Sequence, residues 1–141
     1  MSRPPEPRKE PVSAMHAPID DRLKISALWV SMLLIFAYVD IFGLFRADVL
    51  DGIAREQVAG MAINQTFLAI TTVYILIPSL MVALTLFLPR GVNKWANAGL
   101  AVVYILTIAA SCIGETWAYY LVGSAVEIVL LLVLARVAVR L

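Results

Sequence analysis

The sequence predicts an all-α integral membrane protein, a bundle of four transmembrane helices that run up and down. Of its 141 residues, 62% are hydrophobic and 15% are charged, whereas soluble domains average about 45–50% apolar and about 25% charged residues. The apolar residues gather in four stretches, each close to the ~20 residues that a helix needs to cross a ~30 Å hydrocarbon core. In lipid every backbone polar group must be hydrogen-bonded within the protein, which only helices and closed β-barrels achieve. These stretches are too long and too uniformly apolar for barrel strands, so they are predicted to be helices.

The first 22 residues differ in composition from the rest. They hold five of the seven prolines, mixed charges and the only histidine, His16. Such a segment cannot bury enough apolar surface to offset its ordering entropy, so 1–22 is predicted to be a disordered cytoplasmic tail. With His16 there and Cys112 as the single cysteine, the sequence excludes an intramembrane histidine metal or haem site and a dithiol pair. No cofactor is expected.

The four-helix transmembrane domain is expected over residues 23–141, with helices at about 23–45, 64–88, 95–113 and 117–139. The first stretch exceeds the 7–15 apolar residues of a signal peptide, so we expect a retained helix. The later helices are joined by the short links "PRGVNK" and "GET", which favour antiparallel neighbours in a compact bundle. The loop after the first helix has apolar residues near helical spacing and two glycines. A short interfacial helix and a plain loop both stay open there.

The basic residues are divided unevenly between the two ends of the predicted bundle. Nine of the eleven lie on the side of the two termini: Arg3, Arg8, Lys9, Arg22, Lys24, Arg90, Lys94, Arg136 and Arg140. Only Arg46 and Arg55 lie on the other side. The positive-inside rule therefore predicts a multi-pass plasma-membrane protein with both termini cytoplasmic. The lipid bilayer accounts for these charges as a partner, and nucleic acid is not expected.

Three acids are the main candidates for function. Asp40, in "FAYVDIFGLF" (36–45), lies roughly 8 Å below the outer boundary, and Glu127 lies roughly 15 Å deep, near the midplane. Glu115 ends the third helix, where it is either a functional group or a hydrated end residue. A carboxylate at a helix centre costs at least ~2.5–3.5 kcal/mol, and such acids often mark ion or proton routes. Because burial disfavours the charged form, we expect Glu127 to be largely neutral at about pH 7.

Polar and small residues recur at helical spacing and form one stripe on each predicted helix, so the stripes can converge on a common axis. The stripes are Ser26, Trp29, Phe36, Asp40, Gly43; Asn64, Thr71, Thr72, Ser79; Asn97, Tyr104, Thr107, Ser111, Glu115; and Tyr120, Gly123, Ser124, Glu127. The candidate ligand- or ion-binding residues are Asp40, Glu127, Glu115, Tyr120, Ser124, Tyr104, Ser111, Asn64 and Thr71. The alternative is that small and hydroxyl residues only allow close helix packing and interhelical hydrogen bonds.

Two further features have structural explanations. Pro78 lies inside the second predicted helix, where it frees the carbonyl of Tyr74 and predicts a kink. In "NKWAN" (93–97), Asn93 is expected to cap the start of the third helix, and Trp95 to lie at the headgroup level.

The chain resembles a family of short bacterial membrane proteins known only as a domain of unknown function. The residues that carry the resemblance are "SALW" (26–29), "YVDIFG" (38–43), "IP" (77–78), "NKWAN" (93–97) and "AVEIV" (125–129). It covers about residue 23 to the end, and implies a four-helix bundle without an assigned activity. Its recurrent positions correspond to Trp29, Asp40, Pro78, Asn93, Trp95, Asn97 and Glu127. Two departures, Leu76 where many members have an acid and Tyr119 where they have a histidine, weaken any shared metal-binding role.

Two functions therefore remain open at this point. The first is a binding or transport module, dimeric or otherwise oligomeric, with an outward-facing polar cavity at Asp40 and Glu127 for a proton, a cation or a small cationic ligand. The second is a structural or accessory subunit whose acids only stabilise helix packing. An enzyme is not expected, because the sequence contains no phosphate loop and no clustered nucleophile and base.

Overall fold

The computed structural model describes residues 19–141, and in this range it contains four long helices, one short helix and a two-stranded hairpin. The elements are α1 (Asp21–Gly43), α2 (Ala47–Ala54), β1 (Gln57–Val58), β2 (Met61–Ala62), α3 (Gln65–Phe87), α4 (Arg90–Ser111) and α5 (Ala118–Ala138). The four long helices are long and apolar enough to cross a membrane, which confirms the predicted all-α class and its four helices of membrane-spanning length. Of the predicted tail, residues 1–18 lie outside the described residues, whereas 21–22 already belong to α1.

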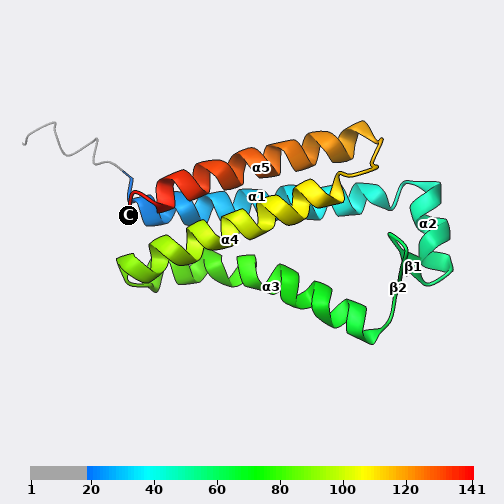
Figure 1. Ribbon diagram of the computed structural model, residues 1–141, viewed down its shortest axis with the longest axis horizontal. Coiled ribbons are helices and arrows are strands. Elements are labelled where there is room, and N and C mark those ends of the chain that lie inside the picture. The colour runs from blue at the N-terminus through cyan, green and yellow to red at the C-terminus, as the bar shows by residue number, and fades with distance from the viewer. Residues whose placement is uncertain (1–18) are drawn as a thin grey trace, which may run out of the picture.

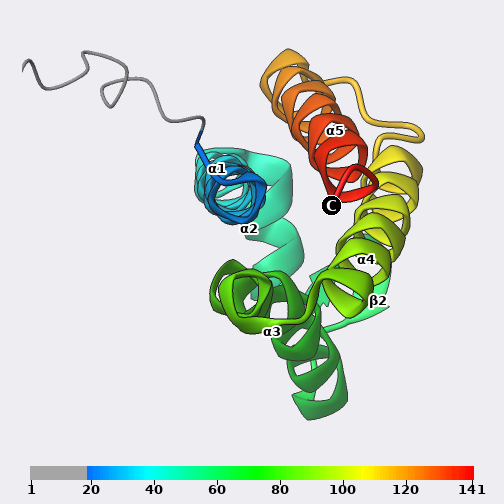
Figure 2. The ribbon, with the colours of Figure 1, turned by 90° about the vertical axis from the view of Figure 1, so that its left-hand side faces the viewer.

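The four long helices form a bundle in which α3 and α4 meet along part of their length and then separate (Figures 1 and 2). α4 packs on α5, α5 packs on α1, and α1 packs on α3, while α3 and α4 make few contacts with each other. We call the end that holds the start of α1 and the end of α5 the terminal end, and the end with α2 and the strands the hairpin end. α3 lies close to the other helices at the terminal end and diverges from them toward the hairpin end (Figures 1 and 2). The prediction of a compact bundle is therefore wrong for α3.

A buried hydrogen-bond network holds three helices together at the terminal end. Asn97 of α4 accepts hydrogen bonds from Trp29 Nε1 of α1 at 2.7 Å and from Thr85 Oγ1 of α3 at 3.2 Å. The Asn97 amide donates to Asn93 Oδ1 at 2.6 Å. The Asn93 amide in turn donates to the Thr85 carbonyl at 2.7 Å. Trp29, Thr85, Asn93 and Asn97 are all fully buried, so this network carries no free polar group toward a ligand.

This network corrects the interpretation of Asn93 as a helix cap. α4 begins at Arg90, with Pro89 at its N-cap, about one turn earlier than predicted. Asn93 therefore lies inside the helix, where its side chain bonds α3 instead of the end of α4. Trp95, in contrast, is 72% exposed, which suits a residue that contacts its surroundings rather than the core.

Pro78 has the predicted consequence, and a neighbouring helix compensates for it. Proline has no amide hydrogen to donate to the carbonyl four residues earlier in the chain. That carbonyl belongs to Tyr74, and it accepts a hydrogen bond from the Tyr104 hydroxyl of α4. Tyr104 is buried. The Tyr104 hydroxyl therefore supplies the donor that Pro78 lacks, and it joins α3 to α4 beside the proline.

A double-mutant cycle tests this pairing of Tyr104 with Pro78. Tyr104→Phe is expected to lower the free energy of unfolding by about 1 kcal/mol, because it leaves the Tyr74 carbonyl without its donor. In a Pro78→Ala background the loss is expected to be close to zero, because the new amide of residue 78 satisfies the same carbonyl. Denaturation of the purified protein in mixed micelles measures both values. Equal losses in the two backgrounds would show that the Tyr104 hydroxyl does not serve this carbonyl.

The loop at the hairpin end contains a short helix followed by a hairpin. α2 occupies the first half, and β1 pairs with β2 in antiparallel register, with Gln57 opposite Ala62. The choice between a short helix and a plain loop is thus decided for the helix over Ala47–Ala54. Leu50 and Ile53 of α2 are exposed, as the predicted interfacial helix requires. The strands had no signal, since each is only two residues long.

Candidate functional site

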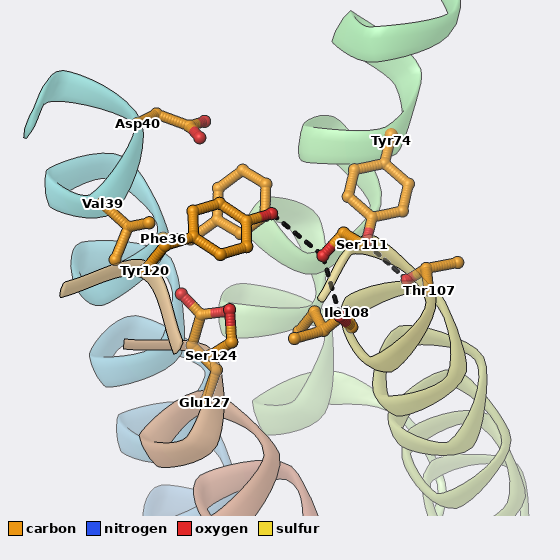
Figure 3. Close-up of a pocket in the computed structure, with 10 residues that line it drawn as sticks. All are labelled: Phe36, Val39, Asp40, Tyr74, Thr107, Ile108, Ser111, Tyr120, Ser124 and Glu127. Carbon is orange, nitrogen blue, oxygen red and sulfur yellow. Dashed lines mark hydrogen bonds between the residues drawn. The ribbon is translucent and has the colours of Figure 1, made fainter. Parts of the chain in front are cut away.

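A pocket of about 250 Å³ lies in the hairpin-end half of the bundle. Side chains from α1, α3, α4 and α5 surround it (Figure 3). Its lining combines two acids, several hydroxyl groups and three aromatic rings: Phe36, Val39, Asp40, Tyr74, Thr107, Ile108, Ser111, Tyr120, Ser124 and Glu127. We call it the carboxylate pocket. It forms where α3 diverges from α4, so the bend of α3 provides the space for it.

Glu127 of α5 lies at the closed side of the carboxylate pocket. Its residue is 2% exposed, and its Oε1 is buried with no hydrogen-bond partner among residues 19–141. Figure 3 shows its carboxyl group pointing into the space between the aromatic rings. A buried polar atom that lacks a partner costs about 1–3 kcal/mol, and more when it is charged. The fold therefore keeps Glu127 at a cost in stability.

Asp40 of α1 lies at the open side of the same pocket. Its residue is exposed, and no hydrogen bond or ion pair to its side chain occurs within the described part of the chain. In Figure 3 it stands apart from Glu127, with the Tyr120 ring between the two carboxyl groups. The pocket thus offers one carboxyl group at its mouth and one at its floor.

Four of the five hydroxyl groups around the pocket donate their hydrogens to other groups of the protein. Tyr120 donates to Ser111 Oγ at 2.9 Å, and Ser111 donates to the Ile108 carbonyl at 2.7 Å. Thr107 donates to the Tyr104 carbonyl at 3.0 Å, so the 2.6 Å contact between Tyr74 and Thr107 has Tyr74 as its donor. None of these four hydroxyl groups therefore has a hydrogen left to donate to Glu127. Ser124 also lines the pocket and is buried.

The structure brings together five of the nine candidate site residues: Asp40, Glu127, Tyr120, Ser124 and Ser111 all line the carboxylate pocket. The other four lie elsewhere. Tyr104 donates to the Tyr74 carbonyl, and Glu115 is in the loop between α4 and α5. Asn64 caps α3 by accepting from the Phe67 amide at 2.9 Å. Thr71 donates to the Phe67 carbonyl of its own helix at 2.9 Å and is exposed.

The stripe predicted on the second helix does not face the common axis. Thr71, Thr72 and Ser79 of α3 each donate to the carbonyl four residues earlier, and each is exposed. The expectation that all four stripes converge is therefore wrong for α3 and holds for the pocket-lining parts of the stripes on α1, α4 and α5. The hydroxyls of α3 satisfy their hydrogen bonds locally, which lets them lie on an outer face.

Sequence reasoning left several pocket residues out of the candidate set. Phe36 and Thr107 lay on the predicted stripes but were not among the nine candidates. Tyr74 could have been found through Pro78, since its carbonyl is the one that the proline leaves without an amide donor. Val39 and Ile108 complete the lining, and an apolar residue in an apolar stretch gives no signal.

The third acid, Glu115, belongs to an ion pair at the hairpin end. Arg46 Nη1 bonds Glu115 Oε2 at 3.0 Å, and Arg46 Nη2 bonds Asp48 Oδ2 at 2.6 Å. The Arg46 guanidinium also lies 4.6 Å from the centre of the Trp117 ring. These contacts join the segment after α1 to the loop before α5. Glu115 is therefore neither free nor in the pocket, and Arg46 was not among the candidates.

The pKa of Glu115 is lowered from its ordinary value of 4.5, first by the hydrogen bond from the Trp117 amide and then by that from Arg46. Likewise, Arg46 lowers the pKa of Asp48. A lowered pKa in the folded state stabilises the fold above the ordinary pKa, and this stabilisation is lost as the pH falls through the folded value.

The ion pair predicts a pH dependence of stability. The wild-type protein is expected to lose stability as the pH falls below about 4.5. Arg46→Gln is expected to lower the free energy of unfolding by up to about 1 kcal/mol at neutral pH, because it removes a partly buried ion pair. It should also flatten the pH dependence. Thermal melts from neutral to acidic pH measure both effects, and an unchanged acid limb in Arg46→Gln would contradict the assignment.

Comparison with known proteins gives a family but no function. A model described as a family of unknown function, DUF6326, matches residues 18–140. No curated protein and no solved structure matches the chain.

Proposed function

The chain belongs to the family of unknown function DUF6326, and we propose that it is a multi-pass membrane protein that binds or transports a cation through the carboxylate pocket. The occupant is a proton, a metal cation or a small cationic ligand. Asp40 receives it at the mouth, and Glu127 holds it at the floor.

Insertion in a lipid bilayer is the first part of this proposal. Each of the four long helices contains an apolar stretch of 18 residues, and at most 28% of such a stretch is buried inside the protein. So much exposed apolar surface requires an apolar solvent. By the positive-inside rule, the excess of basic residues before α1, between α3 and α4 and after α5 supports a plasma-membrane protein with both termini in the cytoplasm. The carboxylate pocket, in the hairpin-end half, faces outward.

The observation that carries the proposal is the unpaired carboxyl group of Glu127. An acid that stabilises helix packing is expected to be hydrogen-bonded across the interface. Oε1 of Glu127 has no such partner within residues 19–141, although the residue is buried. An acid in the interior of a membrane protein that has room beside it is typical of ion and proton routes. This favours a binding or transport module over the alternative, a structural subunit.

The fully bonded network at the terminal end supports the proposal that the two ends of the bundle have different roles. Trp29, Asn93 and Asn97 satisfy one another there, so they serve structure, and the carboxylate pocket at the other end serves binding. Because four helices rarely enclose a complete transport pathway across a membrane, we propose that the protein works as a homo-oligomer, with a dimer as the simplest form. Lipid is its other partner.

Flux measurements in reconstituted vesicles test the proposed function. Wild-type protein is expected to support cation uptake or proton flux, which Glu127→Gln and Asp40→Asn abolish. Glu127→Gln is also expected to keep or raise the melting temperature, because it removes an ionisable group that has no partner. Asp51→Asn is the matched control, since Asp51 is exposed on α2 outside the pocket.

Two results would contradict the proposal. One is flux that Glu127→Gln leaves unchanged. The other is an absence of flux and binding in the wild type together with a clear loss of stability in Glu127→Gln, which is the outcome that a structural acid predicts.

A further inference from the structure

We propose that the occupant of the carboxylate pocket is a small primary amine in its ammonium form, with an aromatic or other apolar body. This inference rests on the proposed function. Of the proton, the metal cation and the small cationic ligand considered there, it selects the cationic ligand. The ammonium group would bind Glu127, and the apolar body would lie against the rings of Phe36, Tyr74 and Tyr120.

The hydrogen-bonding state of the pocket indicates what the occupant must bring. The pocket contains free acceptors but few donors, because the hydroxyls of Tyr120, Ser111, Tyr74 and Thr107 donate within the protein. Glu127 Oε1 accepts nothing from the described residues. A primary ammonium carries a positive charge and three N–H donors, as the lysine side chain does. It supplies both the charge and the donors that the floor of the pocket lacks.

Aromatic rings form much of the wall around this floor. Phe36 of α1 and Tyr74 of α3 lie with ring centroids 6.2 Å apart, and the Tyr120 ring lies between the two acids (Figure 3). A cation within about 6 Å of a ring face is attracted by the negative charge of that face. The same faces bury an apolar body. The pocket therefore provides separate surfaces for the two ends of an amphipathic amine.

A metal ion fits the same lining poorly. Calcium takes 6–8 oxygen ligands, and magnesium requires octahedral oxygen ligation. The pocket offers two carboxyl groups that stand apart, with a ring between them (Figure 3). Within residues 19–141, no three of the His, Cys, Asp and Glu side chains lie close enough to hold a metal ion together.

The volume limits the size of the amine. A pocket of about 250 Å³ corresponds to about eight water molecules at ~30 Å³ each. An amine of about eight to ten non-hydrogen atoms matches this volume, and phenethylamine is of this size. Larger amphipathic cations would need the pocket to open further.

Equilibrium dialysis with radiolabelled phenethylamine tests the inference on the purified, detergent-solubilised full chain. At about pH 7 the amine is protonated, like lysine. We expect saturable binding to the wild type and to Asp51→Asn. We expect Glu127→Gln to weaken it at least about thirtyfold, because a buried charge partner is lost. Competition by 2-phenylethanol, which has the same body without the charge, is expected to be absent. The quaternary phenethyltrimethylammonium, which lacks N–H donors, is expected to compete weakly.

A second variant keeps the test informative if Glu127→Gln proves unstable. Phe36→Leu keeps an apolar side chain but removes one ring, and it is expected to weaken phenethylamine binding about two- to thirtyfold. Binding of methylammonium, which has no apolar body to lie against the ring, is expected to weaken less in Phe36→Leu.

The outcomes separate this inference from the proposed function. If the amine fails to bind while Glu127-dependent proton or metal-cation flux is observed, the inference is overturned and the proposed function stands. If neither amine binding nor flux is found, the inference and the proposed function are both overturned. Equal competition by 2-phenylethanol would show that the pocket does not recognise charge, which also overturns the inference.

Discussion

Asn97→Ala is expected to lower the free energy of unfolding by about 3 kcal/mol. The substitution removes the acceptor of Trp29 Nε1 and Thr85 Oγ1 and the donor to Asn93 Oδ1, and all of these groups are buried. A buried polar group without a partner costs about 1–3 kcal/mol in soluble proteins. Hydrogen bonds between membrane helices average only about 0.6 kcal/mol, so we take the lower end for each group. Titration with denaturing detergent in mixed micelles measures the loss.

The control for Asn97→Ala is Thr72→Ala. Thr72 donates to the Leu68 carbonyl of its own helix and is exposed, so its loss should cost less than about 0.5 kcal/mol. A similar cost for the two variants would mean that the network does not join α1, α3 and α4. Ligand binding at the distant carboxylate pocket is expected to survive Asn97→Ala whenever the protein remains folded.

Gly123→Val is expected to destabilise the fold by about 3 kcal/mol and to abolish ligand binding. A Cβ atom on Gly123 of α5 would overlap Val39 Cγ2 of α1 and would lie 3.9 Å from Ile35 Cγ2. Val39 lines the pocket, so either its side chain has to rotate or the two helices have to separate to admit a side chain at position 123. Overpacking of this kind typically costs about 1–3 kcal/mol, and the branched side chain places Gly123→Val at the upper end.

The matched control is Gly99→Val, on α4. A Cβ atom there would meet nothing within 4 Å, and valine has a slightly better helix propensity than glycine. Gly99→Val should therefore leave stability and ligand binding close to wild type. Equal effects at the two positions would contradict the close approach of α1 and α5.

The sequence was sufficient for the helices but not for their arrangement. Long apolar stretches end where charged or turn residues begin, so most helix bounds were predicted within two residues. The start of α4 was missed because Asn93 looks like a capping residue at a helix end, whereas the fold buries it against Thr85. Periodicity identifies a face of a helix but not the helix that it meets.

The same limit applies to the candidate site. The acids and the stripe on α5 could be predicted, because a polar residue in an apolar stretch is costly and needs a reason. The path of α3 could not, since the hydroxyls of Thr71 and Thr72 can satisfy their hydrogen bonds within their own helix. The partner of Glu115 was missed because Arg46 lies 69 residues away in the chain.

The central claim is that a cation binds the free carboxyl group of Glu127. Infrared difference spectroscopy, with and without the cation, observes that group itself. We predict a change in a carboxyl band when the cation is added, which persists in Asp51→Asn and is lost in Glu127→Gln. A carboxyl signal that is retained in full by Glu127→Gln, or cation binding with no carboxyl signal, would contradict the claim.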